Sequence, residues 1–186
     1  DLKNPVKGIE RLSLNLNQTW QKLDDEGRTQ LFDELYKASS GASRLLDHLL
    51  TWSVQKQGLI QPGWENCKLI DIVSEVLKEV EKSAEWKQVQ IKVSINESLI
   101  ITTDREMISF ILRNLLMNAI KYSFQSGTIE LETHEEKDCV SIVVADHGIG
   151  MKPQLINNLF HPGRMVKRPG TDNEKGTGLG LIIVKE

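Results

Sequence analysis

The sequence of 186 residues lacks any apolar run near the roughly 20 residues that a membrane-spanning helix requires. No signal-peptide pattern precedes the first stretch with helical periodicity. We therefore expect a soluble segment with a cytoplasmic location and no membrane contact of its own, whether or not its parent protein is a sensor anchored in the inner membrane.

Basic residues are not in excess either. Lysine and arginine number 23 and aspartate and glutamate 26, which gives a net charge of −3. A nucleic-acid-binding domain of this size usually has a basic surplus, so we expect no nucleic-acid partner. The sequence has only two cysteines, Cys67 and Cys139, which form no metal-binding or redox motif. They are expected to be reduced thiols, as in most cytosolic proteins.

The sequence begins with two consecutive helical patterns. Apolar residues recur at helical spacing in the first, and from residue 31 they alternate steps of four and three, which is typical of a heptad seam. The first set is Val6, Ile9, Leu12, Leu16, Trp20 and Leu23, and the second is Leu31, Leu35, Ala38, Ala42, Leu45, Leu49 and Trp52. A polar, glycine-containing stretch at residues 24–28 separates them. The pattern predicts an antiparallel helical hairpin over residues 2–57.

Two helices alone cannot enclose a core, because each apolar stripe has only one partner. Pairing with a second copy is the simplest solution, so we expect a homodimer in which each hairpin forms half of a four-helix bundle. The alternative is that the hairpin packs onto the rest of its own chain.

The pattern changes after a linker at residues 58–63, which contains glycine and proline. Beyond it, stretches of helical spacing alternate with short runs in which apolar and polar residues alternate, as half-buried strands do. The predicted elements are helices at residues 69–80 and from about residue 103, and strands at residues 89–95, 128–133 and 140–145. Thr103 and Glu106 have the spacing of a capping box. We expect an α/β sandwich over residues 64–186, and an α+β fold class for the whole chain.

Three polar residues share one face of an otherwise apolar helix at residues 110–123. Asn114, Asn118 and Lys121 are spaced i, i+4 and i+7. Amide oxygens can ligate a cation, and Mg²⁺ takes few protein oxygens because water and phosphates complete its shell. The lysine can then face those phosphates as a point charge. By itself, a polar stripe is more often a solvated helix face.

A second motif follows the last predicted strand, where Asp146 is succeeded by Gly148 and Gly150. The carboxylate can accept a hydrogen bond from an exocyclic amine, and the glycines let the backbone pass close to a flat ligand. Alone, this motif is equally well a strand-ending turn.

The third motif is an alternation of Gly176, Gly178 and Gly180 before an apolar helical run. Backbone N–H groups at a glycine-rich helix start bind phosphate oxygens, although the spacing is not that of a dinucleotide fold or a P-loop. Residues 161–176 are rich in glycine, proline and charge, so they predict a functional lid or a disordered segment. Its basic residues Arg164, Lys167 and Arg168 could reach phosphates, and plain surface charge is an equally good interpretation of them.

In this order, the asparagine helix, the Asp146 turn, Leu159-Phe160 and the sequence GTGLGL resemble the nucleotide-binding motifs of sensor histidine kinases. In that family these are the N, G1, F and G2 boxes, and the fold is the Bergerat α/β sandwich shared with gyrase-type ATPases. The resemblance covers residues 64–186. It implies binding of ATP and Mg²⁺, autophosphorylation of a histidine in the helical hairpin, and transfer of the phosphoryl group to an aspartate of a response regulator.

The resemblance also implies a role for each motif residue. Asn118 coordinates Mg²⁺ with support from Asn114, Lys121 contacts phosphate, Tyr122 lines the adenine pocket and Asp146 recognises the adenine amine. Gly148 and Gly150 shape the pocket wall, and Phe160 is either a hinge or anchor of the lid or an ordinary core aromatic. The phosphates are held by Gly176, Thr177, Gly178, Leu179 and Gly180.

The first five residues, Asp1 to Pro5, match the part of the family's H-box that follows the phosphoacceptor histidine. The resemblance implies that a histidine precedes Asp1, that Asp1 acts as acid and base beside it, and that Asn4 orients water when the regulator is dephosphorylated. The four histidines present, at positions 48, 134, 147 and 161, are poor substitutes. The family's domain usually continues past the glycine-rich helix, so we expect a fragment trimmed at both ends.

Two other functions remain open. ATP-hydrolysing members of the wider superfamily carry a glutamate at the position of Asn114, and an amide cannot act as a base toward water. Asn114 and Lys121 therefore favour phosphoryl transfer by positioning and electrostatics, which disagrees with a gyrase-type ATPase or clamp. A non-catalytic dimeric nucleotide-binding scaffold is the other alternative, and the intact glycines, Asn118 and Asp146 argue against loss of nucleotide binding.

Overall fold

The computed structural model describes residues 3–56, 62–137, 139–160, 168–174, 178 and 180–185, without the side chains at 3–5, 37, 40, 44, 45 and 47–56. The chain divides into two compact units, Asp1–Leu59 and Ile60–Glu186. Among the described residues, no helix has the length and apolar character needed to cross a bilayer. Most of the predicted linker lies outside the described residues.

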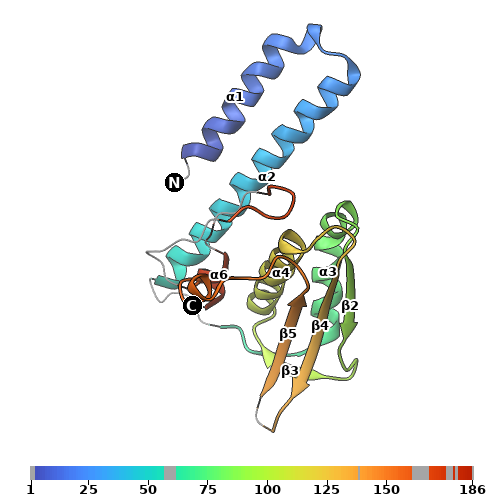
Figure 1. Ribbon diagram of the computed structural model, residues 1–186. Coiled ribbons are helices and arrows are strands. Elements are labelled where there is room, and N and C mark those ends of the chain that lie inside the picture. The colour runs from blue at the N-terminus through green and yellow to red at the C-terminus, as the bar shows by residue number, and fades with distance from the viewer. Residues whose placement is uncertain are drawn as a thin grey trace. The chain divides into compact units, whose positions relative to one another are not determined.

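The first unit is a helical hairpin made of α1 (Lys3–Thr19), the short 3₁₀ helix η1 (Trp20–Lys22) and α2 (Asp25–Lys56) (Figure 1). The predicted break at residues 24–28 is wrong in extent, since α2 begins at Asp25. The Asp24 carboxylate accepts a hydrogen bond from the Gly27 N–H at 2.9 Å and so caps the helix. Acidic residues in the first turn suit the positive end of the helix dipole. The polar run is therefore a helix start.

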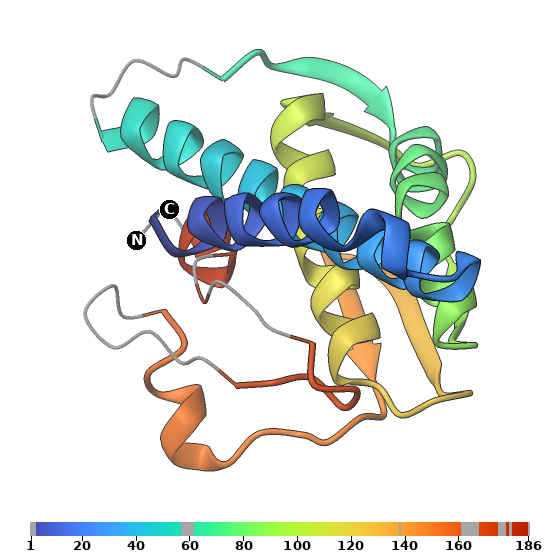
Figure 2. The same cartoon turned by 90° about the horizontal axis from the view of Figure 1, so that it is seen from above.

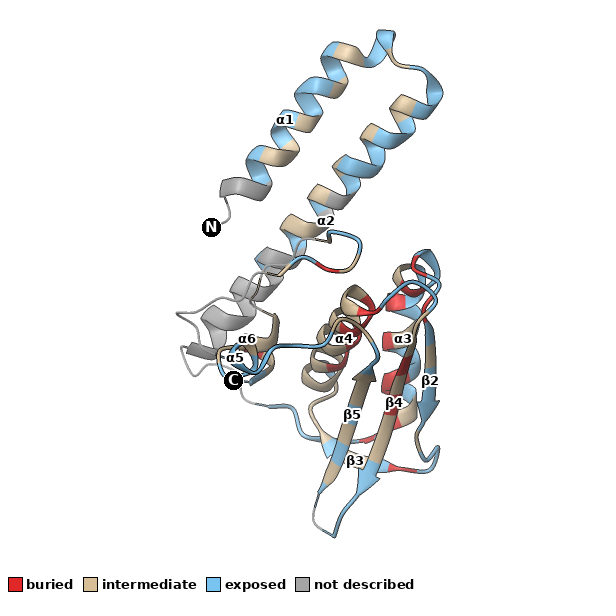
Figure 3. Cartoon of the chain, viewed as in Figure 1, coloured by how far each residue is buried: buried red, intermediate tan, exposed pale blue. Residues whose placement is uncertain are grey.

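The hairpin has contacts but no core of its own. None of the described side chains in this unit is buried (Figure 3). Its turn is held by an edge-to-face contact between Trp20 and Phe32, with ring centroids 5.8 Å apart, and by the Arg28 guanidinium over the Trp20 ring. Large apolar side chains stay exposed along both helices, and these are Val6, Leu14, Phe32, Tyr36 and Leu46.

The second unit has nine elements among its described residues. They are β1 (Glu65–Lys68), α3 (Leu69–Trp86), β2 (Gln90–Ser94), β3 (Ile100–Thr103), α4 (Arg105–Tyr122), β4 (Thr128–Glu135), β5 (Val140–Asp146), α5 (Pro153–Ile156) and α6 (Gly180–Lys185). The main sheet has the order β2-β4-β5, with β2 parallel and β5 antiparallel to β4. The other two strands, β1 and β3, form a separate antiparallel pair.

The core of this unit lies between the sheet and two helices. Figures 1 and 3 show α3 and α4 on the same face of the sheet, with the buried positions turned toward it. Buried side chains come from α3 (Leu69, Ile72, Val73, Val76, Val80), α4 (Leu112, Leu116, Ala119, Ile120) and β4 (Ile129, Leu131). The predicted fold class, a hairpin followed by an α/β sandwich, is confirmed.

Two local features differ from the sequence-based expectation. The pair β1–β3 was not predicted, because β1 is a short polar stretch whose strand character comes from pairing with β3. The cap of α4 is Asp104 and not Thr103. Its carboxylate accepts hydrogen bonds from Met107 N–H at 2.9 Å and Gly63 N–H at 2.8 Å, which lower the pKa of Asp104.

Candidate functional site

The asparagine stripe lies on α4, where both amides are half-buried. The Asn114 amide donates to the Phe110 carbonyl at 2.9 Å, so its oxygen remains available. The Asn118 side chain makes no hydrogen bond to another described residue. The described part of the chain also has no cluster of three or more metal-binding side chains from His, Cys, Asp or Glu. These donors fit Mg²⁺ held by amide oxygen, water and nucleotide phosphates together.

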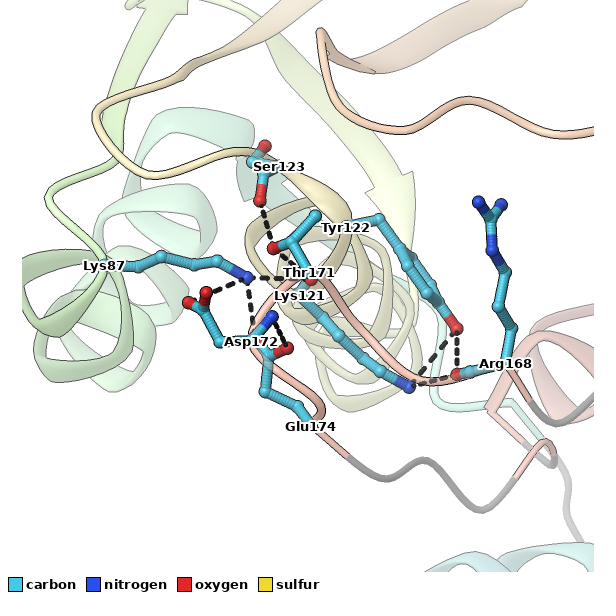
Figure 4. A network of polar contacts seen from close by, with 8 residues as sticks. All are labelled: Lys87, Lys121, Tyr122, Ser123, Arg168, Thr171, Asp172 and Glu174. Atoms are coloured by element: carbon cyan, nitrogen blue, oxygen red, sulfur yellow. Dashed lines mark hydrogen bonds and ion pairs between the residues drawn. The ribbon is translucent and has the colours of Figure 1, made fainter.

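The last turn of α4 brings Lys121 and Tyr122 to one backbone carbonyl. The Lys121 ammonium donates to the carbonyl oxygen of Arg168 at 3.2 Å and to the Tyr122 hydroxyl at 3.2 Å, and that hydroxyl donates to the same carbonyl at 3.3 Å (Figure 4). The ammonium also lies 4.8 Å from the centre of the Tyr122 ring. Two motif residues are therefore held beside residues 168–174, which lead to the glycine-rich run.

The turn after β5 lies directly on the same end of α4 (Figure 2). The Asp146 carboxylate accepts the Gly148 N–H through Oδ1 at 3.0 Å, and the residue is exposed. The Ile149 N–H donates to the Tyr122 carbonyl at 3.1 Å. A Cβ on Gly148 would lie 1.9 Å from that carbonyl oxygen, so only glycine allows this approach. Gly150 has a φ of 55°, which also favours glycine.

The sequence did not predict the residue that joins the end of α4 to residues 168–174, which is Lys87. Lys87 follows α3 and its side chain is 1% exposed. Its ammonium donates to Glu174 Oε1 at 2.6 Å and to the Lys121 carbonyl at 2.8 Å, and it lies 3.7 Å from Asp172 Oδ2. An isolated lysine between a helix and a strand is usually a surface residue, so no signal in the sequence distinguishes this one.

Residues 168–174 are tied to the end of α4 by further hydrogen bonds (Figure 4). The Thr171 hydroxyl donates to the Ser123 carbonyl at 2.6 Å, and its N–H donates to the Lys121 carbonyl at 3.2 Å. Burial by itself would raise the pKa of Glu174. Hydrogen bonds from Lys87, from the Glu174 N–H and from the Asp172 N–H have the larger effect, so this pKa lies below its usual value. The carboxylate is thus stabilised in its ionised form.

Several predicted site residues have a limited description. Asp1, Gly176, Thr177 and Leu179 lie outside the described residues, as do Arg164, Lys167 and the side chain of Asn4. Gly178 is described with a φ of 74°, and Gly180 is the first residue of α6. Phe160 is 41% exposed with the Lys185 ammonium 5.8 Å from its ring, so its interpretation as a core aromatic is wrong. The Arg168 guanidinium donates to the Gly150 carbonyl at 2.6 Å.

Comparison with known proteins assigns this arrangement to a family. Residues 103–186 match the family of histidine kinase-, DNA gyrase B- and HSP90-like ATPases. The sensor protein KdpD of Clostridium acetobutylicum is 29% identical over 191 aligned residues that include 100% of this chain. The chain spans 20% of the length of that relative.

Solved structures of histidine kinases share the fold. The Acinetobacter baumannii histidine kinase AdeS superposes with a TM-score of 0.76 at 22% identity, covering 98% of this chain and 82% of that one. The histidine kinase ThkA, solved in complex with the response regulator protein TrrA, gives a TM-score of 0.63 at 20% identity, covering 87% of this chain and 47% of that one. The chain is similar over its whole length to sensor histidine kinases, and residues 103–186 carry the ATPase-type catalytic fold of that group.

Proposed function

We propose that this chain is the catalytic core of a sensor histidine kinase, which uses Mg-ATP to phosphorylate a histidine of the helical hairpin. The phosphoryl group then passes to an aspartate of a response regulator, which the same core also helps to dephosphorylate. The family match supports ATP binding, and the ThkA complex with its response regulator supports the partner. The observation that carries the proposal is the meeting of the motif residues at the C-terminal end of α4.

The adenine end of the site is assigned to the turn after β5. One oxygen of Asp146 already accepts the Gly148 N–H, and the other makes no hydrogen bond to a described residue, so it can accept the adenine amine. The backbone at Gly148 passes close to the Tyr122 carbonyl, and Gly148 and Gly150 would shape the pocket wall there. Tyr122 would line the pocket from α4.

The phosphate end is assigned to α4 and the glycine-rich run at residues 176–180. Asn118 would ligate Mg²⁺ with Asn114 in support, and the cation would neutralise phosphate charge. Lys121 would exchange its bond to the Arg168 carbonyl for a phosphate oxygen. Phe160 would anchor or hinge the lid between these two parts of the site.

The chemical step itself is a phosphoryl transfer. The bond from the γ-phosphorus to the bridging oxygen breaks, a bond to an imidazole nitrogen forms, ADP leaves, and Asp1 would take the imidazole proton. Asn4, in the first turn of α1, would orient the water that later dephosphorylates the regulator. Asn114 already donates to Phe110 and cannot deprotonate water, so transfer is favoured over hydrolysis.

Nucleotide binding tests this assignment directly. In calorimetric titrations the chain should bind ATP in the presence of Mg²⁺ and much more weakly when EDTA removes it. A chain extended by one histidine before Asp1 should take up label from γ-labelled ATP, and the unextended chain should not. Absence of Mg-dependent binding would contradict the proposal, and steady phosphate release that depends on Asn114 would favour an ATPase instead.

We also infer that two copies of the hairpin pair into a four-helix bundle, because the described residues of this unit bury no side chain and expose large apolar ones. Leu35→Arg should weaken this association by about 100-fold, since an uncompensated charge in an apolar interface costs at least about 3 kcal/mol. The neighbouring exposed change Gln30→Arg should have little effect. Sedimentation equilibrium distinguishes dimer from monomer, and a wild-type chain that stays monomeric at high concentration would rule the pairing out.

A further inference from the structure

A buried lysine holds together three parts of the second unit that are far apart in sequence. The Lys87 ammonium, between α3 and β2, contacts the last turn of α4 through the Lys121 carbonyl and the 168–174 segment through Glu174 and Asp172 (Figure 4). Surface ion pairs contribute little to stability, but the Lys87 side chain is only 1% exposed. An ammonium removed from water needs its partners, because a buried charge without compensation is strongly unfavourable.

Glu174 closes a turn in a segment whose first residue, Arg168, contacts the proposed nucleotide site. Its second oxygen accepts the Asp172 N–H at 2.8 Å, and its carbonyl accepts the Gly170 N–H at 2.9 Å, which closes the 170–174 turn. At the start of the segment, Arg168 receives hydrogen bonds from Lys121 and Tyr122 at its carbonyl and donates to the Gly150 carbonyl. The ion pair therefore acts on both the Asp146 turn and the end of α4.

The segment held by this ion pair contacts residues of the proposed nucleotide site directly. The Arg168 carbonyl accepts from Lys121 and Tyr122, and the Arg168 guanidinium donates to the Gly150 carbonyl in the turn after β5. We propose that Lys87 and Glu174 are positioning residues for ATP: their buried ion pair holds residues 168–174 against the end of α4, and so keeps this end of α4 and the turn after β5 in the arrangement that binds the nucleotide. This inference rests on the proposed function and names residues that none of the nucleotide-binding motifs contains.

A purely structural ion pair would have a different signature. It would lower stability when broken but leave the nucleotide affinity of the folded protein unchanged. A more exposed ion pair in the same unit serves as the control, because Arg113 of α4 contacts Glu79 of α3. That pair also joins the two helices, but its hydrogen bonds run only between these two side chains and do not reach residues 168–174.

The test compares Lys87→Met, Glu174→Gln and the double variant in the full chain, with Arg113→Met and Glu79→Gln as controls. Mg-ATP affinity is measured by calorimetry and stability by the thermal unfolding midpoint. We expect each single change to weaken Mg-ATP binding by about tenfold, and the double variant to be no weaker than the worse single one, because both changes break the same ion pair. The control variants should bind Mg-ATP within about twofold of the wild type.

Two outcomes would overturn the inference: variants with a lowered unfolding midpoint but wild-type affinity, or fully additive losses in the double variant. If Lys87→Met does not fold, Glu174→Gln still decides, because it keeps the side-chain shape and an acceptor oxygen. The wild-type titration separates the two proposals. A wild-type chain without Mg-ATP binding contradicts the proposed function itself, whereas binding that is unchanged in the variants contradicts only the role of the ion pair.

Discussion

Gly148→Ala is expected to abolish detectable ATP binding and to lower the free energy of unfolding by about 3 kcal/mol or more. The added Cβ would lie 1.9 Å from the Tyr122 carbonyl oxygen and 2.9 Å from Asp146 Oδ1. The Tyr122 carbonyl oxygen cannot retreat alone, because it belongs to the last turn of α4 and also accepts the Ile149 N–H. The turn after β5 must therefore move away from α4 and take Asp146 with it.

The control for this change is Gly150→Ala, two residues further on. Gly150 has a φ of 55°, but a Cβ added there would meet no described heavy atom within 4 Å, so the expected cost is only that of the left-handed backbone, about 1 kcal/mol. Urea unfolding and calorimetric titration with Mg-ATP measure both variants. Similar losses at the two positions would show that the close approach to α4 is not what requires glycine at position 148.

Asn118→Ala is expected to remove the Mg²⁺-dependent part of ATP binding and, in the chain extended with a histidine, to abolish autophosphorylation. The amide oxygen is the proposed protein ligand of the cation, and Mg²⁺ has few protein ligands to spare. Alanine is the best helix former, and the Asn118 amide has no described hydrogen-bond partner that the change would leave unpaired. The loss should therefore appear in function and not in stability.

The matching control is Ser109→Ala on the same helix, where the hydroxyl donates only to the Arg105 carbonyl one turn earlier. That variant should keep the wild-type response to Mg²⁺. The measurement is a series of ATP titrations at increasing Mg²⁺ concentration, together with the incorporation of label from γ-labelled ATP. Retained autophosphorylation in Asn118→Ala would remove the metal assignment while leaving the family assignment intact.

Local sequence was sufficient for much of the fold. The spacing of apolar residues predicted the hairpin, α3, α4 and the strands β2, β4 and β5, because burial on one face requires that periodicity. The order of the nucleotide-binding motifs also indicated the sensor histidine kinases, to which the comparisons find the chain similar. Within these predicted elements, the errors lay at the ends. At the start of α2 and at the cap of α4, an aspartate proved to be the N-cap, which composition alone did not distinguish from its polar neighbours.

Features made by distant pairing could not be read in the same way. The strand β1 has a polar sequence and exists through its antiparallel partner β3, in which Thr103 pairs with Glu65 from 38 residues earlier in the chain. Gly148 was predicted to approach a flat ligand, and the structure adds a second demand on it, the approach to the Tyr122 carbonyl. Such requirements depend on which distant segment of the backbone lies beside the residue, and the spacing of apolar residues along the chain does not indicate this.

The sequence by itself determined the hairpin, the two long helices and three sheet strands of the second unit, the resemblance to sensor histidine kinases and the set of candidate nucleotide-binding residues, since these depend on residue type and spacing along the chain. Only the tertiary structure decided how the segment before the glycine-rich run is held. Lys87 is an ordinary lysine in its local sequence, yet it is buried against Glu174, 87 residues away, and against the end of α4. The reason is physical: a charge is stable inside a protein only where the fold brings its partners to it, and the partners of Lys87 come from other segments.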